Sequence, residues 1–282
     1  LGTLRLSGAE LAGSWECDAA EFRTPGGVAI LAEGVTVHSD VFLRNGFAAV
    51  GETRLMDANF SGNLICNNGR FQNEHGYSIN ADRIQVGAAI NLQSHQAASD
   101  DSDDAPRFES YGEARFNGAK VGGQFCTNGA HMANPGGVAL NLDGAQVSGG
   151  TFFHTFPAAG YPRPFYAEGQ GRMFRAHFEK QLVMNGAQIV NDGCTALEAP
   201  GLVVEGDLHF GKDFRAAGAL DLSGARVAGC FYWYGVDTED QVQLELDDAR
   251  FGQLSYERET WNRDRPNLNL TGLVYDRLDP NS

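Results

Sequence analysis

The stretch GETRLMDANFSGNLICNNGRFQN, residues 51–73, contains the pattern that decides the fold. Phe60, Leu64 and Cys66 are separated by two or four residues, and Gly62 interrupts the run. Apolar side chains at alternate positions are typical of strands, whereas glycine and asparagine are typical of tight corners. The stretch therefore predicts short strands joined by corners, and it argues against a helix.

The same template recurs along the whole chain. It has a small or apolar residue at position one and, in most copies, apolar residues at positions three, seven and nine; the last two copies are shortened. The eleven starts are Ala9, Val35, Ala58, Ile84, Ala119, Ala145, Ala176, Leu202, Ala225, Ala249 and Leu273. Most starts are 23 to 26 residues apart, and turns of two kinds alternate. A unit of this length cannot bury its apolar face alone, so we expect consecutive units to stack on one another.

These spacings predict an all-β fold. The architecture that fits them is a right-handed parallel β-solenoid of about eleven coils, with 23–26 residues per coil and alternating odd and even coils, over 1–282 as a single domain. Right-handed coiling is the usual choice for parallel crossovers. Glycine at position five predicts corners that need a positive φ. These glycines are Gly13, Gly62, Gly123, Gly149, Gly206 and Gly229.

Composition excludes several classes of function. A net charge of −15 argues against nucleic acid or an anionic membrane surface as the partner. The five cysteines form no CxxC pair and no zinc-type spacing with histidine, so we expect no metal and no cofactor. The sequence contains no apolar run of about 20 residues and no signal peptide. We therefore expect no direct membrane insertion by this segment, and a location that is cytoplasmic or membrane-associated through flanking regions.

The repeat heads resemble a known family. GETRLMDANFSGNLICNNGRF at 51–71, GARVAGCF at 224–231 and LTGLVYDRL at 270–278 are similar to bacterial pentapeptide-repeat-like β-solenoid proteins, often labelled membrane-associated oxidoreductase. The resemblance covers nearly the whole chain and implies a solenoid within a larger bacterial protein that has membrane-spanning segments elsewhere. The chain departs from strict five-residue repeats, and GQGRMF at 169–174 lacks the last glycine of a dinucleotide fingerprint.

A column of arginines is the first candidate binding feature. An arginine lies four residues before the first template residue in four odd coils, and the even coils have other residues there. The arginines are Arg5, Arg54, Arg115 and Arg172, and the even-coil residues are Leu31, Asn80, Asn141 and Glu198. The column predicts either a site for an acidic ligand or a ladder neutralised by nearby carboxylates. The strongly acidic composition favours the ladder.

Two insertions are the second candidate. They occupy 94–111 and 154–169, and both follow the third strand of an even coil, which predicts that they project from the same edge. Long loops without structure of their own are often functional. A groove between them would contain His95, His154, Tyr161 and Arg163, and Tyr166 of the second insertion is a further candidate binding residue. The other interpretation is a pair of unrelated loops.

The favoured function is a non-enzymatic scaffold or recognition rod in a larger bacterial protein, with a protein or polysaccharide partner. The alternative is a carbohydrate-active β-helix enzyme that acts on a polysaccharide along one face, which requires converging carboxylates or an arginine–carboxylate set. The sequence marks no such pair and contains no Gly-x-Ser-x-Gly, so no catalytic residue is predicted. Uncapped strand edges at the ends predict end-to-end self-association unless flanking segments cover them.

Overall fold

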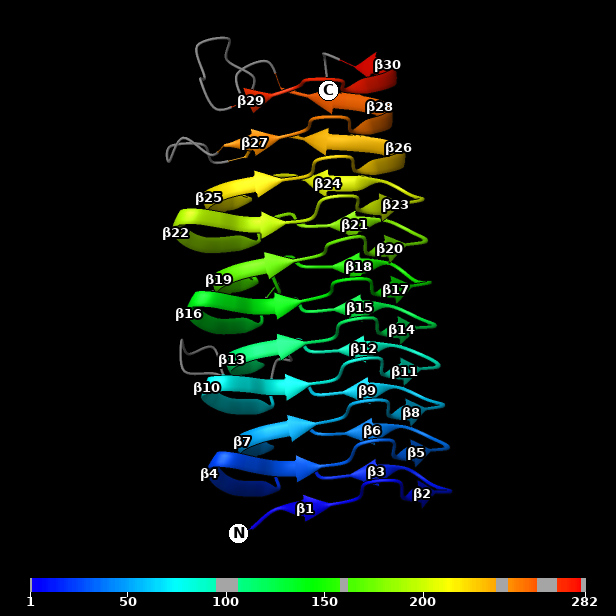
Figure 1. Ribbon diagram of the computed structural model, residues 1–282, viewed down its shortest axis with the longest axis vertical. Coiled ribbons are helices and arrows are strands. Elements are labelled where there is room, and N and C mark those ends of the chain that lie inside the picture. Colours follow the sequence, from blue (N-terminus) through cyan, green and yellow to red (C-terminus); the bar gives the residue numbers. More distant parts are fainter. Residues whose placement is uncertain (1, 95–105, 158–161, 237–242, 258–267, 280–282) are drawn as a thin grey trace.

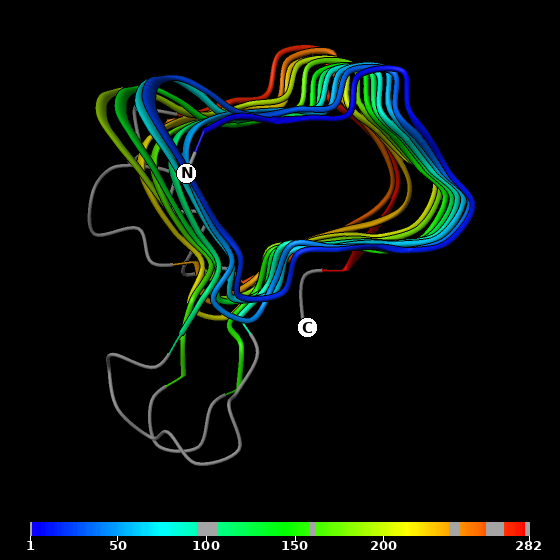
Figure 2. The same ribbon diagram turned by 90° about the horizontal axis from the view of Figure 1, so that it is seen from below.

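The computed structural model describes residues 2–94, 106–157, 162–236, 243–257 and 268–279. These residues form two parallel sheets, of 11 and 19 strands, and contain no helix. No described segment is a helix long and apolar enough to cross a membrane. The coils stack along the long axis with the two termini at opposite ends (Figure 1). Seen from the N-terminal end, the chain runs clockwise as it recedes, so the solenoid is right-handed (Figure 2).

The 11-stranded sheet takes one strand from each repeat, as the spacing predicted. Its strands, in spatial order, are β1 (Leu4–Arg5), β4 (Glu21–Leu31), β7 (Ala48–Arg54), β10 (Arg70–Asn80), β13 (Glu109–Arg115), β16 (His131–Asn141), β19 (Tyr166–Arg172), β22 (Gln188–Glu198), β25 (Arg215–Asp221), β27 (Leu244–Glu245) and β29 (Leu268–Asn269). The even-coil strands β4, β10, β16 and β22 have 11 residues, whereas the odd-coil strands β7, β13, β19 and β25 have seven. The predicted alternation of odd and even coils is therefore confirmed.

The 19-stranded sheet contains two sets of short strands on either side of a corner. The leading strands, which follow the template start, are β2 (Glu10–Leu11), β5 (Thr36–Val37), β8 (Asn59–Phe60), β11 (Gln85–Val86), β14 (Lys120–Val121), β17 (Gln146–Val147), β20 (His177–Phe178) and β23 (Val203–Val204). The trailing strands are β3 (Trp15–Glu16), β6 (Val41–Phe42), β9 (Leu64–Ile65), β12 (Ile90–Asn91), β15 (Phe125–Cys126), β18 (Thr151–Phe152), β21 (Leu182–Val183) and β24 (Leu208–Phe210). In the last three coils the two sets merge into β26 (Arg226–Trp233), β28 (Arg250–Tyr256) and β30 (Val274–Asp279).

A left-handed residue precedes every template start. Its φ lies between 51° and 71° in all eleven coils, which suits glycine and, less well, other residues. These residues are Gly8, Gly34, Asp57, Arg83, Gly118, Gly144, Arg175, Gly201, Gly224, Asp248 and Gly272. The turn is closed by a backbone hydrogen bond, such as that from the Ala58 N–H to the Leu55 carbonyl at 3.1 Å.

The prediction for the position-five glycines is wrong. None of Gly13, Gly62, Gly123, Gly149, Gly206 and Gly229 has a positive φ. The physical reason at most of these corners is close approach of the coil below. A Cβ on Gly149 would lie 2.5 Å from the carbonyl carbon of Gly123, and one on Gly206 would lie 2.8 Å from the backbone nitrogen of Gln181. At these positions glycine is required because it has no side chain.

Aromatic rings of successive coils pack against one another in the core. Phe47 lies 5.2 Å from Phe71 between ring centroids, and Phe71 lies 5.6 Å from Phe108, one ring in each of three successive coils. All three side chains are buried. Such pairs add stabilisation to that of the buried area.

The last coil leaves its large apolar residues partly exposed. The exposed fraction of each residue lies between 39% and 45% for Leu270, Val274, Tyr275 and Leu278. End-to-end association stays a prediction.

The inward and outward sides of one strand provide a test of the register. Phe60 has 0% of its surface exposed, whereas its neighbour Asn59 in β8 is exposed and faces outward. We expect Phe60→Ala to lower the free energy of unfolding by about 3–5 kcal/mol, because it leaves a cavity in the stack. The control Asn59→Ala should change it by less than about 0.5 kcal/mol. Urea denaturation of the two variants measures both values, and equal losses would contradict this inward–outward assignment.

Candidate functional site

The arginine column lies in the register that the sequence predicted. In the 11-stranded sheet Arg54 pairs with Leu31 and Asn80, and Arg115 pairs with Asn80 and Asn141. Arg172 pairs with Asn141 and Glu198 in the same way. The arginines therefore lie two strand spacings apart, about 10 Å, with an asparagine between them.

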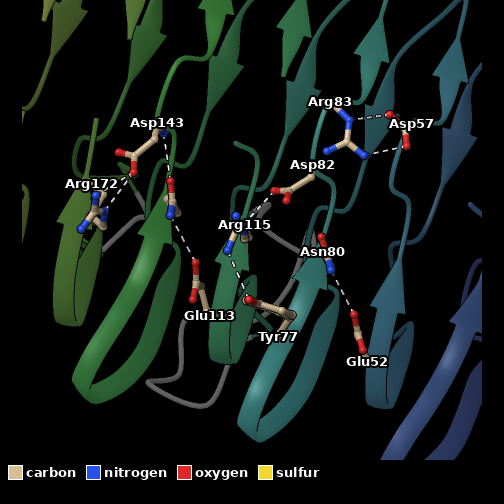
Figure 3. Close-up of polar contacts among 11 residues, drawn as sticks. Glu52, Asp57, Tyr77, Asn80, Asp82, Arg83, Glu113, Arg115, Asp143 and Arg172 are labelled. Atoms are coloured by element: carbon tan, nitrogen blue, oxygen red, sulfur yellow. Dashed lines mark hydrogen bonds and ion pairs between the residues drawn. The ribbon is translucent and has the colours of Figure 1, made fainter. Parts of the chain in front are cut away.

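Carboxylates of the chain itself pair with the guanidinium groups of Arg115 and Arg172 (Figure 3). Arg115 Nε lies 2.8 Å from Asp82 Oδ1, and Nη1 of the same side chain donates a 3.2 Å hydrogen bond to the Tyr77 hydroxyl. Arg54 Nε lies 2.9 Å from Glu52 Oε1. The column has the arrangement expected of a ladder neutralised within the protein.

Arg172 is held between two acids. Its Nη2 lies 2.8 Å from Asp143 Oδ2, and its Nη1 lies 2.8 Å from Glu198 Oε2. An acidic ligand at Arg172 would have to displace two carboxylates that are already in place, which is unfavourable. The partly buried positions of these residues explain the pairing, because an unpaired charge there would be costly.

Glu113, in strand β13 beside the ladder, has a raised pKa. Asn141 Nδ2 donates to its Oε1 at 3.3 Å, just as Asn80 donates to Glu52 at 3.2 Å two coils earlier. Burial raises the pKa of Glu113, and the hydrogen bond from Asn141 and the charge of Arg115 oppose that rise. Burial is the largest cause, so the ionised form is the disfavoured one.

This shift predicts a pH-dependent stability. The folded chain holds the Glu113 proton more tightly than the unfolded chain, so stability falls as pH rises through the unfolded and then the folded pKa. Glu113→Gln removes the ionisation and keeps an oxygen for Asn141. We expect the variant to melt at a higher temperature than the parent at pH 7, and the difference to vanish below about pH 4.

The control for this prediction is Glu179→Gln, because Glu179 is exposed and forms no ion pair within the described residues. Thermal unfolding of both variants should show the pH-dependent gain for Glu113→Gln alone. A destabilised Glu113→Gln protein at pH 7 would mean that the ionised carboxylate supports the fold.

A contact between described residues joins the two insertions. Arg163 of the second insertion donates a hydrogen bond from Nη1 to the Pro106 carbonyl of the first at 3.4 Å. His154 lies nearby in sequence, and its Nδ1 is 3.2 Å from the Thr155 carbonyl. His95 and Tyr161 lie outside the described residues, so the predicted groove between the insertions stays a prediction. Tyr166 belongs to β19 and faces a different set of residues.

The residues that surround Tyr166 form a cluster around His131, which the sequence pattern does not mark. Arg107 Nη2 lies 2.8 Å from His131 Nδ1, and the rings of Tyr111 and Tyr166 lie 5.8 Å and 5.4 Å from the His131 ring. Guanidinium groups only donate, so Nδ1 accepts and the proton is on Nε2. Burial lowers the pKa of His131, and Arg107 lowers it further. The cluster anchors the end of the first insertion to the sheet.

Three of the cysteines, Cys66, Cys126 and Cys230, are buried and have the environment of packing groups. Burial raises the pKa of Cys126 and of Cys230 to about 11. Burial also raises the pKa of Cys66. Thiols of this kind stay protonated at neutral pH. Among the described residues no group of three or more histidines, cysteines and acids is arranged to hold a metal ion.

A shallow groove lies over four leading strands, β8, β11, β14 and β17, which follow one another along the rod (Figure 1). Its volume is about 330 Å³. The register places Asn59, Gln85, Lys120 and Gln146 in one outward column across these strands. All four side chains are exposed.

The groove differs from the arginine ladder in having free polar groups. Within the part of the chain that the structure describes, the side chains of Asn59, Gln85, Lys120 and Gln146 form no hydrogen bond or ion pair. Glu179 lies at the edge of the groove, and its side chain likewise forms no hydrogen bond or ion pair with a described residue. The groove therefore offers amide, ammonium and carboxylate groups that can bind another molecule without breaking a contact.

Two glycines form the floor of the groove. Gly87 and Gly122 follow the outward column by two residues in adjacent coils. A Cβ on either residue would press on the backbone carbon of the coil below, at 3.1 Å in both cases. The absence of two neighbouring side chains leaves the hollow. The sequence shows these glycines, but only the stacking shows that they lie side by side.

No protein-family model, no curated protein and no solved structure matches this chain.

Proposed function

We propose that the chain is a non-enzymatic β-solenoid recognition rod, which binds a polysaccharide or protein partner along its outward face and releases it unchanged. The observation behind this proposal is the groove column Asn59, Gln85, Lys120 and Gln146, whose exposed polar groups have no partner among the described residues. We also infer from the repeat heads that the rod belongs with the bacterial pentapeptide-repeat-like proteins and forms part of a larger bacterial protein.

The rigid frame of the rod supports this function. Every ladder between its named strands is parallel, and the buried residues of successive coils form one continuous core. A surface built on such a frame loses little conformational freedom when it binds. The partner therefore meets side chains that are already spaced at fixed intervals.

A second candidate, a carbohydrate-active enzyme, is favoured by one observation. Arg115 lies beside both Asp82 and Glu113, and burial raises the pKa of the Glu113 carboxyl. A carboxyl group with a raised pKa close to a second acid is an arrangement that general acid–base catalysis uses. Asp82 is nevertheless buried and already bound to Arg115. The ladder thus offers fewer free groups to a substrate than the groove does.

The two candidates give different results with polysaccharides. We expect at least one of a panel of neutral and acidic polysaccharides to retard the protein in native affinity electrophoresis. Incubation of the same polysaccharides with the protein should release no new reducing ends or unsaturated products, because the proposed rod only binds.

Turnover that disappears in Glu113→Gln would contradict the non-enzymatic proposal and support the enzyme. Turnover that persists in Glu113→Gln would also contradict the non-enzymatic proposal, and it would show that Glu113 is not the acid responsible. The parent protein and the variant should be purified in parallel for this comparison.

A further inference from the structure

We propose that the groove over β8, β11, β14 and β17 binds an uncharged, hydroxyl-rich glycan chain that lies along the rod axis. This inference rests on the proposed function and adds the class of ligand and its direction.

The groove has balanced charges. Lys120 provides one ammonium group and Glu179 one carboxylate, and neither forms an ion pair within the described residues. The remaining polar groups of the lining are amides and hydroxyls. An anionic polymer would meet one cation in a chain of net charge −15, so long-range repulsion opposes it. A neutral ligand fits this lining best.

The amides select groups that both donate and accept. Each of Asn59, Gln85 and Gln146 has an NH₂ donor and a carbonyl acceptor. A sugar hydroxyl matches this pair, since it accepts from the NH₂ of one amide and donates to the oxygen of the next. Ser61 and Ser148 add hydroxyls of the same kind at the two ends of the glycine floor. Lys120 adds a donor at the centre.

The strand spacing favours a glycan over an extended peptide. The wall presents one polar side chain per coil, so its groups repeat at about 4.8 Å along the rod. A β-strand peptide in the same direction presents equivalent groups every two residues, at about 6.6–6.8 Å, and loses the match after one coil. A pyranose unit in an extended chain advances by a length close to one strand spacing. Successive sugars can therefore meet successive coils.

The glycine floor gives room for the rings. Gly87 and Gly122 have no side chain between the outer serines, and a Cβ there would also strain the stack. The exposed side chains of the lining are polar, and its apolar residues Phe60, Val86 and Val121 are buried. Recognition by hydrogen bonds from a rigid, shallow wall predicts modest affinity that grows with the number of sugars bound.

The test uses the whole chain and defined oligosaccharides. Calorimetry should detect binding of at least one neutral linear hexaose among cellohexaose, xylohexaose, mannohexaose and a (1→3)-β-glucohexaose. Gln85→Ala and Gln146→Ala should each weaken that binding about fivefold, and Lys120→Ala about tenfold, from the hydrogen bonds removed. The matched controls are Lys180→Ala and Gln124→Ala, which are exposed and lie outside the groove. They should leave the affinity unchanged.

Several outcomes would overturn the inference. One is that none of the four hexaoses binds, and another is that the groove and control variants weaken binding equally. A third is tighter binding of a hexagalacturonate, or of an extended Ser-Gly peptide, than of every neutral hexaose. Cleavage of a hexaose bound in the groove would instead overturn the non-enzymatic function and leave the ligand class supported, so the two failures are distinguishable.

Discussion

The fixed distance between parallel strands, about 4.8 Å, is the constraint on which the rest of this structure depends. It places each template position of one coil directly over the same position of the coil before it. A slip of one residue would exchange the inward and outward sides of a strand, so the register has to hold in every coil. The left-handed residue before each template start maintains it, because the chain turns the same corner at the same place eleven times.

Vertical alignment also explains why odd and even coils differ. Arginines in consecutive coils would lie one strand spacing apart and would repel one another. The alternation inserts Asn80 or Asn141 between them, and it allows carboxylates such as Asp82 and Asp143 to approach from the neighbouring turns. Because every second coil is different, a stack of like charges becomes a ladder of ion pairs.

The fold could be predicted from the sequence because it depends on spacings of two and of 23–26 residues, which are visible along the chain. The arginine register was predicted for the same reason. The partners were not, since Asp82 is 33 residues from Arg115 and nothing local joins them. The position-five glycines were identified, but composition does not distinguish a positive φ from a close backbone contact. The groove was missed because the absence of side chains at Gly87 and Gly122 becomes a hollow only when two coils are stacked.

Burial decides which polar column of such a rod can bind a ligand. Side chains half-buried beside the long even-coil strands, such as Glu113 and Arg115, must find partners within the chain, because an unpaired charge there costs folding free energy. Side chains on the open leading strands, such as Gln85 and Lys120, are satisfied by water and can remain unpaired at little cost. The more conspicuous charges in the sequence are therefore the less available ones. The weaker pattern, a column of amides around one lysine, has the groups that a partner can use.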